Sequence, residues 1–278
     1  MSVISKSLDF IKNHLSQQKS DLPFVVGFSG PQGSGKTYCS EAIASQLNSA
    51  GIKCVKFSMD DLYLTYQDQR EITKKALQDD NELLQGRGLP GTHDLKLCLQ
   101  ILHDLKHFSG PVSIPIYDKS AYSGKGDRDL KFVIVDSKPN VVIFEGWFNG
   151  YVNLQPDQIR LRYFSTQGEG YVTKHPLYQI EELNSELNKY CEIWRQFDAF
   201  IYMASDYANV ATWRLQQEHD LIAKTGDGMS DEMVLKFIER YMPMYELYYQ
   251  NLKDYGCETI QDRPSLKLSI NLKRELLD

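Results

Sequence analysis

The chain has 278 residues, of which 42% are hydrophobic and 24% are charged, and its formal net charge is −6. This length and composition are typical of one large α/β enzyme domain. The negative charge argues against nucleic acid as the main partner, because a phosphate backbone binds a basic face. The five cysteines form no C-x-x-C pair, and no apolar run approaches the ~20 residues that span a bilayer. We therefore expect a single reduced cytoplasmic domain over 1–278, without disulfides, structural zinc, a secretory signal or a membrane partner.

The first predicted element is an amphipathic helix near the N-terminus, because Ile4, Leu8, Ile11 and Leu15 recur at helical spacing. We expect the apolar face of this helix to pack against the core of the domain. An apolar run over 24–28 comes next, and it predicts a buried strand that leads into a glycine-rich turn.

This glycine-rich turn fits the pattern G-x-x-x-x-G-K-[ST] of a phosphate-binding loop. It consists of Gly30, Pro31, Gln32, Gly33, Ser34, Gly35, Lys36 and Thr37. The strand before it and a helix expected over 38–47 place backbone N–H groups at a helix N-terminus, where the macrodipole favours anions. Lys36 is expected to reach the β- and γ-phosphates, and Thr37 is expected to ligand Mg²⁺. The motif therefore predicts binding of a nucleoside triphosphate.

Further apolar runs predict the remaining strands of a parallel α/β sheet. They lie at 53–58, 141–144, 200–203 and 267–270, and they alternate with helical segments. Such alternation is typical of buried parallel strands joined by right-handed crossovers. Because the carboxyl ends of parallel strands meet at one edge, we expect the polar residues that follow them to line a ligand site there.

Acidic residues follow two of these strands. Asp60 and Asp61 come directly after 53–58, and one carboxylate near the phosphates can orient an acceptor hydroxyl and accept its proton. Because consecutive strand residues point to opposite sides, we expect only one of the pair to face the site. Capping of the next helix is the alternative role. Glu145 follows 141–144, where it can bind Mg²⁺ through water or orient the attacking group.

Residues 85–136 interrupt the alternation with glycine-rich polar loops and an expected hairpin, 113–117 with 131–135. We interpret this region as an acceptor-binding insertion. Lys and Arg on glycine-bearing loops can hold an anion, and Arg does so bidentately. The alternative is a set of solvated surface loops. The candidate acceptor-binding residues are Arg87, His93, Asp94, Tyr117, Lys119 and Arg128.

Residues 213–249 predict two helices joined by a glycine-rich turn at 224–228, and Ser230 is expected to cap the second helix. Such a joint suits a mobile helical lid, with a rigid surface pair of helices as the alternative. Arg214, near the start of the first helix, can neutralise charge that develops on a transferred phosphoryl group. It can equally pair with Glu218, one helical turn further along.

Together these segments resemble the P-loop kinases of the phosphoribulokinase, uridine kinase and bacterial pantothenate kinase superfamily. Within it, the chain resembles the D-glycerate 3-kinase group and its fungal ATP-dependent kinase members. The matching segments, in family order, lie at 30–37, 58–63, 85–94, 115–120, 124–128, 144–147 and 213–218. The resemblance implies an α/β P-loop NTPase fold, with a parallel five-stranded sheet flanked by helices, and ATP with Mg²⁺. It maps the catalytic aspartate onto Asp60 rather than Asp61. It places acceptor recognition around Arg87, His93, Asp94 and the segment 117–128.

We therefore expect a kinase that transfers the γ-phosphoryl group of ATP to a hydroxyl of a small anionic metabolite, with D-glycerate as the first candidate. An anionic acceptor is expected because Arg and Lys residues concentrate on the loops of 85–136 in an acidic protein. A nucleoside or pantothenate acceptor and a catalytically silent ATP-binding protein are the alternatives. A guanine-specific switch is disfavoured, because 188–191 lacks the Asp of N-K-x-D. The candidate catalytic residues are Lys36, Asp60, Glu145 and Arg214, and the candidate metal ligands are Thr37, Asp60 and Glu145.

Overall fold

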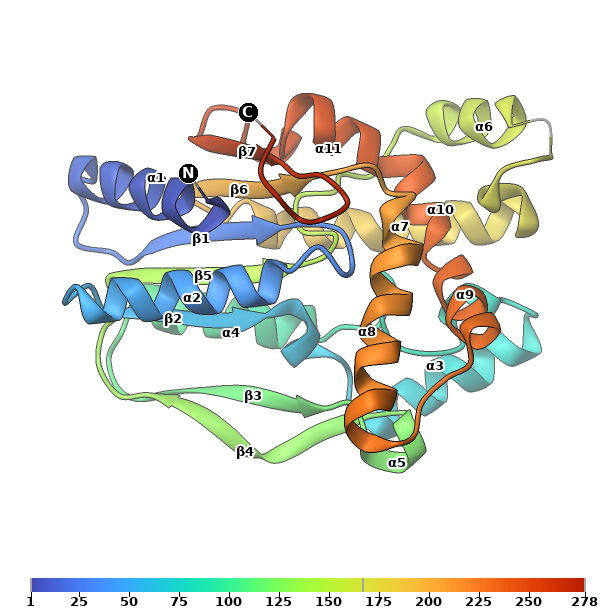
Figure 1. Ribbon diagram of the computed structural model, residues 1–278, viewed down its shortest axis with the longest axis horizontal. Coiled ribbons are helices and arrows are strands. Elements are labelled where there is room, and N and C mark those ends of the chain that lie inside the picture. Colours follow the sequence, from blue (N-terminus) through green and yellow to red (C-terminus); the bar gives the residue numbers. More distant parts are fainter. Residues whose placement is uncertain (1, 167, 278) are drawn as a thin grey trace.

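A five-stranded parallel sheet, in the order β2–β5–β1–β6–β7, forms the centre of the computed structural model, which describes residues 2–166 and 168–277 (Figure 1). Every residue of β1, β5 and β6 is buried, because helices cover both faces of the sheet. This confirms the predicted fold class and all five predicted strands. The strands are β1 (Phe24–Ser29), β2 (Cys54–Ser58), β5 (Val141–Gly146), β6 (Ala199–Ala204) and β7 (Ser265–Ser269).

Two helices, α1 (Val3–Gln17) and α2 (Lys36–Ser49), cover one face of the sheet (Figure 1). Ser2 caps α1 by accepting a hydrogen bond from a backbone N–H in the first turn at 3.1 Å. The predicted apolar stripe of α1, including Leu8 and Ile11, packs into one core cluster with β1 and α2. The amphipathic first helix is therefore confirmed, and it closes this side of the core.

The opposite face of the sheet packs against a larger core that is rich in aromatic side chains. Its central helices are α4 (Leu95–Lys106) and α7 (Leu177–Trp194). The fully buried Trp194 donates its indole N–H to the carbonyl oxygen of Tyr151 at 2.9 Å, so burial leaves this donor satisfied. The shorter elements on this side are α6 (Pro156–Ser165), α11 (Gln250–Tyr255), η2 (Glu82–Leu84), η3 (Tyr171–Lys174) and η5 (Glu258–Ile260).

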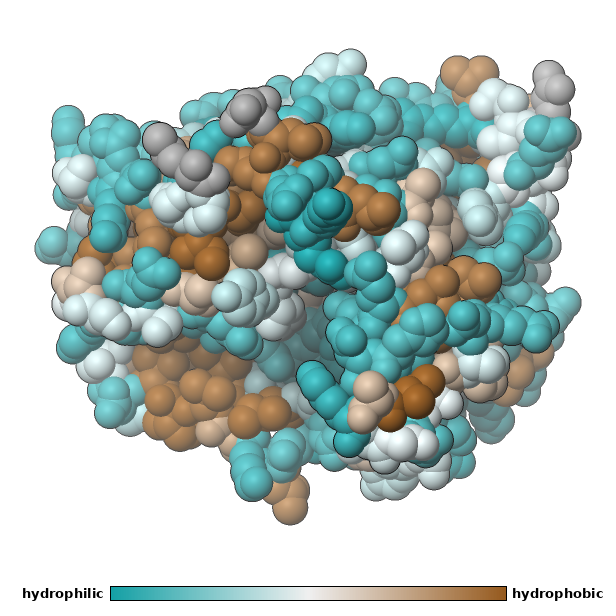
Figure 2. All heavy atoms as spheres, in the orientation of Figure 1, coloured by the Kyte–Doolittle hydropathy of each residue, from teal (hydrophilic) through white to brown (hydrophobic). Residues whose placement is uncertain are grey.

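An antiparallel hairpin of β3 (Val112–Asp118) and β4 (Asp127–Val135) lies beside the main sheet, at the bottom of Figure 1. It confirms the predicted hairpin. The short helical turn α5 (Ala121–Gly124) joins the two strands and brings the connecting loop toward the carboxyl edge of the sheet. Figure 2 shows an apolar area over the hairpin. The exposed large apolar residues of β4 are Leu130, Phe132, Val133 and Ile134.

Elements from separate parts of the chain gather at the carboxyl edge of the sheet (Figure 1). The 3₁₀ helix η1 (Met59–Leu62) and α3 (Tyr66–Gln78) follow β2, whereas α8 (Asn209–Thr225) and α9 (Asp231–Glu239) follow β6. Ser230 caps α9 by accepting a backbone N–H at 3.3 Å, as predicted. The two predicted helices are therefore present, and their movement as a lid stays a prediction.

The second half of the predicted lid region belongs to the core. After α9 the chain forms α10 (Met242–Met244) and the π-helical turn η4 (Tyr245–Tyr249), and Tyr245 and Tyr248 are each only 1% exposed. The exposed helical pair therefore ends with α9. All five cysteines are free and buried. None of the helices in the described ranges combines the length and the apolar character that a membrane crossing requires.

Candidate active site

The phosphate loop connects β1 to α2 and lies at the carboxyl edge of the sheet. Gly33 and Gly35 adopt φ values of +81° and +86°, which side chains with a Cβ rarely tolerate. Gly35 is the N-cap of α2, and Lys36 is the first residue of that helix. The loop therefore presents successive backbone N–H groups at a helix N-terminus, as the motif predicts.

Two distant side chains hold this loop from outside. The N–H of Gln32 donates to the hydroxyl oxygen of Tyr245 at 2.9 Å, and Nε of Arg274 donates to the carbonyl oxygen of Gly33 at 2.8 Å. A Cβ on Gly33 would also collide with Trp213 of α8. Sequence reasoning missed Tyr245 and Arg274 because no local pattern links them to the loop. Their contacts support the phosphate loop in this conformation.

Thr37 and Glu145 form a pair of oxygen donors beside the phosphate loop. The Thr37 hydroxyl donates to Oε1 of Glu145 at 2.9 Å, and Nζ of Lys56 lies 3.7 Å from the same oxygen. Glu145 is 2% exposed, and its Oε2 has no hydrogen-bond partner among the described residues. A hydroxyl and a carboxylate with an uncommitted oxygen fit Mg²⁺, which usually takes one or two protein ligands and completes its shell with water and phosphate.

Asp60 and Asp61 point to different environments, but for a reason other than strand alternation, because both lie in η1. Oδ2 of Asp61 accepts the N–H of Ser58 at 2.8 Å and so closes a capping box at the start of η1. Asp60 instead lines a cavity, where its carboxylate accepts hydrogen bonds from the Tyr63 hydroxyl at 2.9 Å and from Nζ of Lys119 at 2.5 Å. The expectation that only one aspartate faces the site agrees with this arrangement.

The charge of Asp60 is set by its surroundings. Burial on its own would raise the pKa of Asp60, but the ammonium groups of Lys119 and Lys36 outweigh it and hold the pKa at about 2. Burial raises the pKa of the neighbouring Tyr63 phenol well above its usual range, so this phenol stays protonated and donates to the carboxylate. Asp60 is therefore an ionised acceptor of protons at neutral pH.

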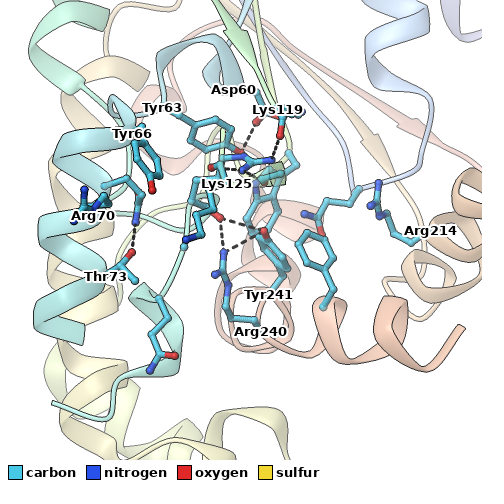
Figure 3. A pocket seen from close by; sticks show the side chains of 18 of the residues that line it. Asp60, Tyr63, Tyr66, Arg70, Thr73, Lys119, Lys125, Arg214, Arg240 and Tyr241 are labelled. Atoms are coloured by element: carbon cyan, nitrogen blue, oxygen red, sulfur yellow. Dashed lines mark hydrogen bonds and ion pairs between the residues drawn. The ribbon is translucent and has the colours of Figure 1, made fainter. Parts of the chain in front are cut away.

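The cavity has a volume of about 780 Å³. Residues of the phosphate loop, of α3 and of α9 line it (Figure 3). Its lining is strongly positive, since its acidic residues are Asp60 and Glu71. The cationic residues of the lining are Lys36, Arg70, Lys74, Arg87, Lys119, Lys125, Arg214 and Arg240. In a protein with net charge −6, this concentration favours an anionic ligand.

Two of the predicted acceptor residues, Arg87 and Lys119, line the cavity. The Arg87 guanidinium donates to the carbonyl oxygens of Gly124 at 2.8 Å and Lys125 at 2.5 Å. It also lies 5.6 Å from the ring centroid of Tyr117. Arg87 therefore fixes the loop between β3 and β4 as one wall of the cavity.

His93 lies behind the cavity rather than in it. Its buried ring stacks on Tyr63 with 4.6 Å between centroids, and its Nδ1 is 2.7 Å from the hydroxyl of Tyr190. Burial lowers the pKa of His93 to about 3, so the ring is neutral at physiological pH. In this position the side chain supports Tyr63, which in turn contacts Asp60.

Asp94 and Arg128 also lie outside the cavity lining, and they bind each other. Nη2 of Arg128 is 2.9 Å from Oδ2 of Asp94, and Nε of Arg128 donates to the carbonyl oxygen of Tyr63 at 3.2 Å. Asp94 also caps α4 by accepting a backbone N–H at 2.9 Å. Tyr117, 8% exposed, packs edge-on against Tyr63 with centroids 5.1 Å apart. These three residues therefore surround Tyr63 and tie it to the hairpin.

Arg214 of α8 lines the cavity, as expected for a residue that approaches the phosphates. Its guanidinium donates to Oε1 of Gln217 at 2.8 Å and lies 5.5 Å from the ring centroid of Phe237 on α9. The alternative pair with Glu218 does not form. Glu218 is 6% exposed and instead accepts the N–H of Met229 at 2.7 Å, which secures the turn between α8 and α9.

The chain has relatives among known proteins along its whole length. No protein-family model matches it. It is 37% identical over 257 residues to an uncharacterised kinase of Schizosaccharomyces pombe, covering 91% of this chain and 90% of that protein. It is 33% identical over 292 residues to a probable ATP-dependent kinase of Saccharomyces cerevisiae, covering 99% and 95%. The solved D-glycerate 3-kinase of Cryptococcus neoformans matches 100% of this chain and 98% of its own, with a TM-score of 0.91 at 34% identity.

Proposed function

We propose that this chain, which belongs to the P-loop kinase family of D-glycerate 3-kinase and the fungal ATP-dependent kinases, phosphorylates a hydroxyl of a small anionic metabolite. Its family makes it an ATP-dependent kinase, and the acceptor is the part that we propose. D-glycerate is the first candidate, because a D-glycerate 3-kinase aligns over the whole chain at 34% identity.

A single observation carries the proposal: the ionised carboxylate of Asp60 and the ammonium of Lys36 line the same positively charged cavity. A kinase needs a proton acceptor for the attacking hydroxyl and a cation at the transferring phosphoryl group. A carboxylate on the acceptor would be attracted by the remaining cations, including Lys119 and Arg87. A neutral nucleoside would offer no negative charge to these cations.

Each group has a defined task in this reaction. The N–H groups of the phosphate loop and Lys36 bind the β- and γ-phosphates, and Arg214 balances negative charge that develops during transfer. Asp60 orients the acceptor hydroxyl and receives its proton as the new O–P bond forms and the bond to the leaving ADP breaks. Tyr63 keeps the Asp60 carboxylate aimed into the cavity through its hydroxyl.

Thr37 and Glu145 would hold Mg²⁺, directly or through water. The ion would supply positive charge to the phosphate oxygens. The uncommitted Oε2 of the buried Glu145 is the feature of this chain that fits such an ion.

The test is ADP release by the purified chain with MgATP and a panel of acceptors: D-glycerate, longer hydroxy acids, neutral nucleosides and pantothenate. We expect release to be stimulated by hydroxy acids, with D-glycerate among them, and the phosphorylated product to be visible by mass spectrometry. Lys36→Ala should lower turnover to background while its melting temperature stays close to that of the wild type.

Two outcomes would count against the proposal. Phosphorylation of nucleosides with no activity on any hydroxy acid would overturn the anionic acceptor. Near-normal turnover by a folded Lys36→Ala variant would overturn the role of the phosphate loop.

A further inference from the structure

The wall of the cavity formed by α3 is longer than a three-carbon acceptor requires. The α3 residues in the lining recur every three or four positions and so share one helix face (Figure 3). They are Tyr66, Gln69, Arg70, Thr73, Lys74 and Leu77, with Glu71 at the margin. At 1.5 Å per residue, the distance from Tyr66 to Leu77 along the helix is about 16 Å. D-glycerate spans only about 5 Å by ordinary bond lengths.

The far part of this wall carries uncommitted positive charge. The side-chain nitrogens of Arg70 and Lys74 form no hydrogen bond or ion pair within the described ranges. The Arg70 guanidinium lies 5.8 Å from the ring centroid of Tyr66. Lys125, on the loop that faces α3 across the cavity, is likewise uncommitted in this part of the chain (Figure 3). Uncommitted cations in the lining of one cavity favour an anionic ligand there.

A buried polar atom on the same helix face points to a ligand independently of these charges. Gln69 lines the cavity and is 7% exposed. Its Nε2 donates to the hydroxyl oxygen of Thr73 at 3.3 Å, but its Oε1 has no partner among the described residues. A buried acceptor without a partner is costly, and a hydroxyl group of a bound ligand would satisfy it.

We propose that α3 forms a second acceptor subsite, in which Arg70 and Lys74 bind a distal anionic group of a polyhydroxylated acid and Gln69 accepts a hydrogen bond from one of its hydroxyls. This inference rests on the proposed function, since it extends the same cavity beyond the reacting hydroxyl. The acceptor class it names is a sugar acid or related chain with a phosphate or carboxylate at the end remote from Asp60.

The test compares D-gluconate with 6-phospho-D-gluconate, which differ only in a distal phosphate. Binding is measured by calorimetry on the full chain with Mg²⁺ and a saturating non-hydrolysable ATP analogue, so that the probe cannot occupy the phosphate loop. A charge-assisted contact predicts that the phosphate tightens binding about ten- to a hundredfold. Arg70→Gln and Lys74→Gln should each remove most of this difference.

Lys75→Gln is the matched control, because Lys75 is an exposed neighbour on α3 outside the cavity lining. It should keep the full preference for the phosphorylated probe. Melting curves of all three variants should match the wild type, since the substituted side chains are exposed. D-gluconate and D-glucarate form a second pair that tests a distal carboxylate in the same way.

Equal affinity for the members of both pairs, or an undiminished preference in Arg70→Gln and Lys74→Gln, would overturn the subsite. The proposed function can fail separately. If D-glycerate is phosphorylated but a distal anion has no effect, the kinase assignment stands and the subsite is wrong. If 6-phospho-D-gluconate binds through Arg70 and Lys74 but no hydroxy acid is phosphorylated, the subsite stands and the proposed reaction is wrong.

Discussion

Lys119 and Asp60 form an ion pair across 2.5 Å inside the cavity that also contains Lys36. The pair joins the loop after β3 to the 3₁₀ helix after β2, so two segments that are far apart in the chain meet at one carboxylate. Because Lys119 is a larger influence than Lys36 in lowering the pKa of Asp60, the state of this pair controls how readily Asp60 accepts a proton.

The first prediction concerns pH. The pKa of Asp60 is about 2, so the carboxylate stays ionised throughout the range in which activity can be measured. Lys119→Met removes a positive charge, and the pKa should therefore rise. An acidic limb of kcat/KM should therefore appear in profiles of Lys119→Met recorded between pH 4 and 8, whereas the wild type should lose no activity through protonation of Asp60 in this range. Lys131→Met, which removes an exposed lysine of β4, should keep the wild-type profile.

The same pKa determines how the contribution of Asp60 to folding stability changes with pH. Because the folded pKa of Asp60 lies below its ordinary value, ionised Asp60 stabilises the fold above about pH 4, and this contribution is lost as the pH falls toward 2. Lys119 is 58% exposed at its side chain, so solvent screens the pair and the effect on stability is small. A pH profile of Lys119→Met that matches the wild type would contradict the coupling between Lys119 and Asp60.

The second prediction separates the two aspartates. Asp60→Asn keeps the shape of the side chain but removes the proton acceptor, so kcat should fall by roughly 10²–10⁴ with little change in ATP affinity. Asp61→Asn is the matched control, because its amide oxygen can still accept the N–H of Ser58. Steady-state measurements of kcat and of the KM for ATP in both variants show which aspartate accepts the proton. If their effects are exchanged, Asp61 is the base and the assignment is wrong.

The third prediction concerns the metal. Glu145→Gln replaces the carboxylate beside Thr37 with a neutral amide, and the Mg²⁺ concentration needed for half-maximal activity should rise about 10–100-fold. Glu41→Gln is the control, since Glu41 also contacts Lys56, at 3.4 Å, but has a side chain that is 63% exposed. Equal Mg²⁺ dependence in the wild type and Glu145→Gln would remove Glu145 from the metal site.

The fourth prediction concerns Arg128, which bridges the carboxylate of Asp94 and the carbonyl oxygen of Tyr63. The single ammonium group of lysine cannot replace the planar guanidinium at both contacts. Arg128→Lys should therefore leave Tyr63 held less firmly in its position. The KM for the acceptor should rise about tenfold, while the KM for ATP stays close to that of the wild type. Arg160→Lys, which alters an exposed pair with Glu181, is the control. A change confined to the KM for ATP would place Arg128 with the nucleotide instead.

Residues 30–37 show how much of the site can be read from the sequence. Glycines at positions that require positive φ, a lysine and a threonine follow one another without a gap, and the strand and helix around them are local patterns too. The strands β1, β5 and β6 were predictable for the same reason, because a parallel strand that is buried on both faces is a short apolar run. Asp60 and Glu145 were identified by their position after such runs.

The sequence by itself therefore determined the fold class, the phosphate loop and the acidic residues at the sheet edge, because each depends on neighbours only a few positions away. Only the tertiary structure decided which candidate acceptor residues line the cavity. Arg87 and Lys119 do so, whereas Asp94 and Arg128 form an ion pair outside the lining. It also decided which distant side chains hold the phosphate loop: Tyr245 and Arg274 lie 213 and 241 positions from their partners. Contacts over such separations arise from packing of whole elements, and a single sequence carries no local pattern for them.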